Sequence, residues 1–143
     1  MGGLLALDFS VIFCNGTYGD VMLAAAVDLK VLIVEDDPST CDMMVRLMTR
    51  HGIASECATT VGEALLKLEQ SNSPSALILD INLPDANGSL LIRRIRREDL
   101  PIKVAVVTGV SDPSIYEDLL QIPPDRLFQK PVNFAQLVKW VQE

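Results

Sequence analysis

Polar side chains directly follow several apolar runs of this sequence. They are the carboxylates of Glu35, Asp36, Asp37 and Asp80, the hydroxyl of Thr108 and the ammonium of Lys130. Carboxylates that are held together repel one another, so such a group predicts a bound hard cation, and oxygen ligands with few protein donors suit Mg²⁺. A lysine facing them would neutralise phosphoryl oxygens. Asp80 is then a candidate nucleophile for forming an acyl phosphate.

These side chains can meet only if the apolar runs are neighbouring strands of one sheet. From Lys30 onward, five short runs alternate with five segments whose apolar residues recur at helical spacing. The runs are Val31–Val34, Ile53–Cys57, Ala76–Leu79, Val104–Val107 and Arg126–Gln129. Strands that alternate with helices form a parallel sheet covered on both faces, and ligands bind beyond the carboxyl ends of its strands. The pattern therefore predicts a doubly wound α/β fold that gathers the polar side chains at one edge.

Local signals indicate where the helices begin. Asp37-Pro38 and Asp112-Pro113 each place a cap residue before a proline that suits the first helical position. Thr60–Glu63 reads as a capping box, in which the two side chains satisfy free backbone N–H groups reciprocally. We therefore interpret Asp37, Asp85 and Asp112 as helix caps or turn residues rather than as reactive groups.

Composition excludes several kinds of protein. The 143 residues carry a formal net charge of −7, which is unfavourable for a broad surface that binds DNA or anionic membranes. No apolar stretch approaches the roughly 18 residues of a membrane span. A single histidine, His51, excludes a site built from several histidines, and its position before Gly52 favours a helix cap. The odd number and irregular spacing of Cys14, Cys41 and Cys57 predict free thiols in a reducing compartment.

Residues 1–28 differ from the regular pattern that follows them. Two apolar segments, Phe9–Cys14 and Val21–Val27, flank the turn pair Asn15-Gly16. No basic residue precedes Ala24–Ala26, so a cleaved secretion signal is disfavoured. We interpret residues 1–28 as a leader of uncertain structure, a tag-like extension or sequence upstream of a true start at Met22, and residues 29–143 as the folded domain.

Four sequence markers resemble those of the receiver domain of two-component response regulators. They read VLIVEDDP, LILDINLPDANG, VVTG and QKPV, and they follow the order of that family. The likeness covers the chain from Lys30 to Glu143. It implies a CheY-like, flavodoxin-like sheet with the strand order 2-1-3-4-5. It also implies a switch in which an aspartate accepts a phosphoryl group from a phosphohistidine.

The resemblance assigns the metal and the phosphoacceptor to particular residues. Asp80 would accept the phosphoryl group and also ligate Mg²⁺. Asp36 would ligate the ion directly, Glu35 would do so through water, and the backbone carbonyl of Asn82 would supply a further ligand.

Further residues would contact the phosphoryl group or report its presence. Lys130 would pair with the phosphoryl oxygens, in a peptide with Pro131 that is typically cis in this family. Thr108 would move toward the phosphoryl group as the switch, and Gly109 would leave room for it. Leu127 stands where the family usually has an aromatic residue that is coupled to the threonine. Val110 cannot hydrogen-bond an attacking water, which favours a long-lived phosphorylated form.

Three functions follow from the resemblance. The leading hypothesis is a cytoplasmic, stand-alone phosphoacceptor that is not an enzyme and has no output domain. Its partner would be a sensor histidine kinase or a histidine phosphotransfer protein, with no direct binding to nucleic acid or membrane. The alternatives are a receiver fragment of a hybrid histidine kinase or longer regulator, and a pseudo-receiver that is never phosphorylated. A phosphatase of the haloacid dehalogenase type is disfavoured, because Asn82 stands where that family needs a second aspartate.

Overall fold

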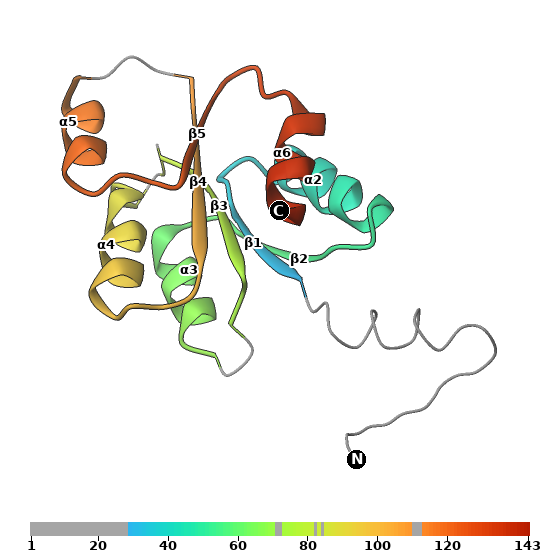
Figure 1. The fold of residues 1–143 in the computed structure, drawn as a ribbon, viewed down its shortest axis with the longest axis horizontal. Helices are drawn as coiled ribbons and strands as arrows, with labels where there is room; N and C mark the ends of the chain where they lie inside the picture. The colour runs from blue at the N-terminus through green and yellow to red at the C-terminus, as the bar shows by residue number, and fades with distance from the viewer. Residues whose placement is uncertain (1–28, 71–72, 82, 84, 110–112) are drawn as a thin grey trace.

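The computed structural model describes residues 29–70, 73–81, 83, 85–109 and 113–143, in which strands and helices alternate (Figure 1). The elements are β1 (Lys30–Val34), α2 (Pro38–Arg50), β2 (Ala54–Ala58), α3 (Val61–Leu68), β3 (Ala76–Asp80), α4 (Ser89–Arg97), β4 (Lys103–Thr108), α5 (Pro113–Gln121), β5 (Arg126–Gln129) and α6 (Phe134–Gln142). All five predicted strands are present, and β2 begins and ends one residue later than expected. The leader, residues 1–28, lies outside the described residues.

The five strands form one parallel sheet in the order β2-β1-β3-β4-β5. This order confirms the doubly wound α/β fold and the order implied by the resemblance. The chain reverses its direction of travel across the sheet between β1 and β3. Because ligand sites of such sheets lie at this reversal, the residues after β1 and β3 are the ones that should face a ligand.

Helices cover both faces of the sheet, α3, α4 and α5 on one face and α2 and α6 on the other (Figure 1). Alternate residues of β1 show the division, since Leu32 packs toward the first group and Ile33 toward the second. Each strand buried in this way is apolar on both sides, which explains why the strands appear in the sequence as short continuous apolar runs. Among the described residues, no helix is long and apolar enough to cross a membrane.

Helix starts follow the capping signals, with one difference. Asp37 caps α2 by accepting a hydrogen bond from the backbone N–H of Thr40 at 3.2 Å. Thr60 caps α3 in the same manner, through the N–H of Glu63 at 3.1 Å. The carboxylate of Glu63, however, accepts from the N–H of Thr59 at 2.8 Å. In the expected capping box, Glu63 would instead accept from the N–H of Thr60, so its actual partner lies one residue earlier.

Asp85 caps α3 from a distant part of the chain. Its two carboxylate oxygens accept hydrogen bonds from the N–H groups of Val61 at 2.9 Å and Gly62 at 3.1 Å. These two bonds, Val61 first, lower the pKa of Asp85. The interpretation of Asp37 and Asp85 as caps is confirmed, whereas Asp112 lies outside the described residues.

A second set of side-chain bonds ties the segment between β3 and α4 to α5. Asn87 donates from its amide to Asp118 at 3.0 Å, and its side-chain oxygen accepts from the N–H of Ser89 at 2.9 Å. Asp85 and Asn87 thus attach the segment between β3 and α4 to two helices, α3 and α5.

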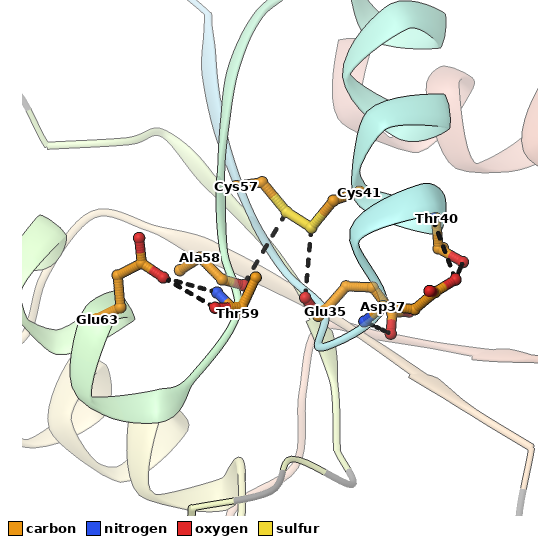
Figure 2. Close-up of a disulfide and its surroundings, with 8 residues drawn as sticks. All are labelled: Glu35, Asp37, Thr40, Cys41, Cys57, Ala58, Thr59 and Glu63. Atoms are coloured by element: carbon orange, nitrogen blue, oxygen red, sulfur yellow. Dashed lines mark hydrogen bonds between the residues drawn. A yellow bond between two sulfur atoms is a disulfide. The ribbon is translucent and has the colours of Figure 1, made fainter.

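The prediction of free thiols is wrong for two of the three cysteines. Cys41, in α2, and Cys57, in β2, form a disulfide, with their Cα atoms 6.0 Å apart (Figure 2). That separation lies within the range that a disulfide can span. The spacing of the two cysteines in the sequence gives no sign of this pair, because their proximity arises only when β2 returns alongside β1 and under α2. Cys14 lies outside the described residues.

Candidate functional site

Three carboxylates meet at the carboxyl ends of β1 and β3. Glu35, Asp36 and Asp80 each offer an oxygen, and these oxygens lie within 4.8 Å of one another. Glu35 and Asp80 are buried, whereas Asp36 is exposed. The sheet places them together because β1 and β3 are hydrogen-bonded neighbours that end at the same edge. The structure thus brings together three of the predicted metal-binding residues.

The surroundings of Glu35 disfavour the ionised form of its carboxyl group. Burial is the largest cause that raises the pKa of Glu35, and a side-chain hydrogen bond with Asp36 and the charge of Asp80 raise it further, to about 7. The N–H of Asp37, which donates to the Glu35 carboxylate at 3.2 Å, and the charge of Lys130 act in the opposite direction. A divalent cation would stabilise the ionised form of all three carboxylates. The donor set therefore fits Mg²⁺, which prefers oxygen ligands of this kind.

Lys130 reaches the cluster from the end of β5. Its ammonium donates to Asp80 Oδ2 at 3.1 Å, across 50 residues of sequence. Burial works against the charged form of Lys130, but the bond to Asp80 and the charges of Asp80, Glu35 and Asp36 together raise its pKa. The side chain is thus held as a cation beside the phosphoacceptor candidate.

A backbone hydrogen bond holds this lysine beside the end of β4. The N–H of Lys130 donates to the carbonyl of Thr108 at 2.9 Å, and the Lys130–Pro131 peptide is cis, as the resemblance implies. A side chain at Gly109 would place its Cβ 3.3 Å from Cβ and Cδ of Lys130. Gly109 therefore leaves room for the aliphatic part of Lys130, in addition to its predicted role beside the phosphoryl group.

Thr108 and Leu127 occupy different environments. Thr108 is the last residue of β4 and is buried, and it pairs in register with Gln129 of β5. Leu127 is 44% exposed, and its neighbour Phe128 is buried on the face covered by α2 and α6. Phe128 thus points to the opposite face of the strand from Leu127, as the alternation of side chains along a strand requires. Asn82 and Val110 lie outside the described residues.

A cavity of about 510 Å³ opens beside the carboxylates. Its polar side is formed by the acid cluster and Lys130. Its apolar side includes Met43 of α2, Phe134 of α6 and Val132, which precedes α6. The sequence predicted the polar side but not the apolar one. Met43 is 45% exposed and lies off the buried stripe of Cys41, Met44 and Met48, so its spacing excludes it from the core but does not indicate that it lines a cavity.

The assembled groups provide the parts needed for transfer of a phosphoryl group to a carboxylate. Asp80 supplies a nucleophilic oxygen, and Lys130 supplies a cation that can pair with phosphoryl oxygens. Glu35 and Asp36 add negative charge that could hold a divalent ion next to Asp80. No zinc-type or nucleophile–histidine arrangement is formed by these residues.

Comparisons with known proteins agree with this arrangement. The family model of the response regulator receiver domain matches residues 31–142. The regulator TorR of the torCAD operon in Escherichia coli K12 is 34% identical over 108 residues, which are 76% of this chain and 46% of TorR. The probable C4-dicarboxylate response regulator DctR of Bacillus subtilis is 32% identical over 114 residues, 79% of this chain and 50% of DctR. The chain thus spans about half the length of these curated relatives.

Solved structures show the same fold. A CheY-like receiver domain protein from Methanospirillum hungatei has a TM-score of 0.72 and 30% identity, over 80% of this chain and 90% of that one. A receiver protein from Pseudomonas putida has a TM-score of 0.74 and 26% identity, over 81% of this chain and 97% of that one. From the family match, the strand order and the position of the acid cluster, we conclude that this chain belongs to the receiver domain family of two-component response regulators.

Proposed function

We propose that this receiver domain is a phosphoacceptor switch that is phosphorylated on Asp80. The observation that carries the proposal is the position of Asp80, which is buried among Glu35 and Asp36 and bonded to Lys130 at 3.1 Å. A pseudo-receiver is expected to lack the aspartate, the lysine or the acidic pair, and all of these are present here. The partner would be a histidine kinase or a histidine phosphotransfer protein.

The transfer exchanges one bond to phosphorus for another. A carboxylate oxygen of Asp80 attacks the phosphorus of a phosphohistidine, the P–O bond forms, the P–N bond breaks, and the departing imidazole keeps the electron pair and takes a proton. Catalysis of such transfers comes mainly from positioning and from neutralising charge on the phosphoryl oxygens. Lys130 supplies one positive charge at this point. Its present bond to Asp80 would be exchanged for one to a phosphoryl oxygen.

The metal site would be completed by residues that the resemblance identifies. Asp36 and Asp80 would bind Mg²⁺ directly, Glu35 would do so through water, and the Asn82 carbonyl would contribute one ligand. When bound, Mg²⁺ neutralises charge on the phosphoryl oxygens. Glu35 has a second task, because its carboxylate accepts the N–H of Asp37 and so fixes the segment that carries Asp36.

The switch would operate through Thr108, at the end of β4. Its hydroxyl would move toward the phosphoryl group, and Gly109 would leave room for that group. Since Leu127 replaces the usual aromatic residue, the response would reach the exposed surface of β5 without an aromatic side chain that changes its rotamer. The net charge of −7 supports docking to protein rather than to nucleic acid. We also propose a cytoplasmic location.

The test is phosphorylation by acetyl phosphate in the presence of Mg²⁺, measured by intact mass. We expect one phosphoryl group on the wild-type protein and none on Asp80→Asn. The matched control is Asp85→Asn, which removes a nearby carboxylate that caps α3 and should still be labelled. Equal labelling of Asp80→Asn and the wild-type protein would show that Asp80 is not the acceptor.

A further inference from the structure

The disulfide between Cys41 and Cys57 lies beside the acid cluster rather than at the periphery of the domain. Cys41 is the fourth residue of α2, and Cys57 is the last but one of β2. Glu35, the first residue of the segment between β1 and α2, lies beside the bridge (Figure 2). The bridge therefore joins the two elements that flank the proposed metal ligands.

The backbone of Glu35 is held at both ends of this bridge. Its N–H donates to the carbonyl of Ala58, the residue after Cys57, at 2.9 Å. Its own carbonyl oxygen lies 3.3 Å from the sulfur of Cys41. The position of Glu35 thus depends on the distance between β2 and the first turns of α2, and the disulfide fixes this distance (Figure 2).

The same connection continues to the other acidic residues. The Glu35 carboxylate accepts the N–H of Asp37 at 3.2 Å, and Asp37 caps α2 through the N–H and the hydroxyl of Thr40 at 3.2 and 2.6 Å. Asp36 lies between these two bonded residues. A change in the position of α2 relative to β2 would therefore change the relative positions of the carboxylates that face Asp80.

The cytoplasmic location proposed above would favour reversible formation of this disulfide. A cytoplasmic receiver would work among dithiol reductants, where protein disulfides are usually transient and sense redox state. Cys41 is buried, whereas Cys57 is only half-buried. A thiolate would accordingly attack Cys57, with Cys41 as the leaving group.

We propose that Cys41 and Cys57 are a reversible redox modification site whose disulfide braces the acid cluster for binding Mg²⁺. This inference rests on the proposed function of the cluster. In the reductive step, a thiolate of a dithiol reductant attacks Cys57 Sγ, the S–S bond breaks, and Cys41 leaves as a thiolate and takes a proton. The second thiolate of the reductant then attacks the mixed disulfide and releases Cys57, which also takes a proton. The protein gains two electrons and two protons, and the reductant becomes a disulfide.

The expected effect is on the affinity for Mg²⁺. A braced site is already ordered, whereas the reduced site must become ordered when the ion binds. Residues that orient metal ligands typically change metal affinity by about tenfold or more when they are lost. Because the cysteines act through the backbone of Glu35 rather than on a ligand atom, we expect the Kd for Mg²⁺ to rise by about threefold to tenfold on reduction.

The experiment compares two redox forms of one polypeptide. The Cys14→Ser variant is prepared oxidised and after treatment with dithiothreitol, and Mg²⁺ binding is measured by isothermal titration calorimetry. Intact mass must show that the oxidised form is two hydrogens lighter. We expect weaker Mg²⁺ binding in the reduced form, and a Cys14→Ser/Cys41→Ser/Cys57→Ser variant that matches it and does not respond to dithiothreitol. If the oxidised and reduced forms, each confirmed by mass, have equal Kd values for Mg²⁺, the disulfide does not brace the acid cluster and the proposal is overturned.

Reversibility is tested separately in buffers of different ratios of reduced to oxidised glutathione. Interconversion of the two masses across these buffers supports a redox site, and a pair that stays oxidised in the most reducing buffer would be a permanent crosslink and would overturn the proposal. Acetyl phosphate labelling separates this inference from the function on which it rests. If both forms are labelled on Asp80 and bind Mg²⁺ equally, only the redox inference fails. If neither form binds Mg²⁺ or is labelled, the proposed phosphoacceptor function fails as well.

Discussion

Gly88 offers a quantitative test of how closely α4 approaches the strand that carries Asp80. A Cβ added at this position would lie 3.0 Å from a methyl carbon of Leu79, 3.3 Å from the backbone oxygen of Asp80 and 3.3 Å from Cα of Ile81. Two of these three neighbours are backbone atoms, which cannot move aside as the end of a side chain can. The Gly88→Ala substitution should therefore force α4 away from β3.

The magnitude follows from two opposing effects. Adding a methyl group to a packed position typically costs about 1–3 kcal/mol. Lower conformational entropy of the unfolded chain offsets about 0.4–1 kcal/mol of that cost. We expect a net loss of about 1.5 kcal/mol in the free energy of unfolding, which for a domain of this size lowers Tm by roughly 5–8 °C.

Gly62 is the matched control, since it also lies at a helix start. A Cβ there would meet only Asp85 Oδ2 at 3.7 Å and Thr60 Oγ1 at 4.0 Å, both ordinary contacts. Gly62→Ala should therefore stabilise the fold by about 0.5–1 kcal/mol. The free energy of unfolding of both variants is measured by urea denaturation, monitored by circular dichroism. The slope of that free energy against urea concentration should stay unchanged. If Gly88→Ala is as stable as the wild-type protein, or if both variants shift in the same direction, the close approach of α4 is not as described.

Three further outcomes are expected. Asp36→Asn should reduce the rise in Tm that saturating Mg²⁺ causes, while making the metal-free protein more stable because repulsion falls; an unchanged rise in differential scanning calorimetry would place the ion elsewhere. Because the pKa of Glu35 is raised from 4.5 to about 7, the folded state binds more protons than the unfolded state in that interval. The free energy of unfolding of the metal-free protein should then fall between pH 4.5 and 7, by at most about 3 kcal/mol through Glu35. If urea titrations of Glu35→Gln show the same dependence of this free energy on pH, the prediction is wrong. Reducing the Cys41–Cys57 disulfide, which closes a loop of sequence separation 16, should lower the free energy of unfolding by about 3 kcal/mol, and an unchanged urea midpoint would rule out the loop-entropy effect.

Much of this fold could be predicted from the sequence, because the signals were local. Buried parallel strands such as β3 appear as continuous apolar runs, and the residue that follows each run is the one at the sheet edge. Asp80 and Lys130 were therefore found together although 50 residues separate them. The cis peptide before Pro131 followed from the family resemblance alone.

Other features depend on contacts that no local pattern records. The Cys41–Cys57 pair forms only after β2 has joined the sheet, so cysteine spacing predicted free thiols. Asp85 was recognised as a cap or turn residue, but its partner helix α3 begins 24 residues earlier in the chain. The boundaries of the edge strand β2 shifted by one residue, since its partly exposed side chains give a weaker pattern than those of the central strands.

The two hydrogen bonds between Asp85 and the start of α3 make two backbone amides sensitive to the position of the segment after β3. The segment after β3 is joined to α3 by hydrogen bonds from the amides of Val61 and Gly62, and these amides lie in the first turn, where a helix supplies no acceptor of its own. Their protection from exchange with solvent deuterium therefore depends on the Asp85 carboxylate. A displacement of the segment that follows Asp80 would expose both amides while the rest of α3 stays protected. Hydrogen exchange at two positions in one helix would thus record events at the end of a neighbouring strand.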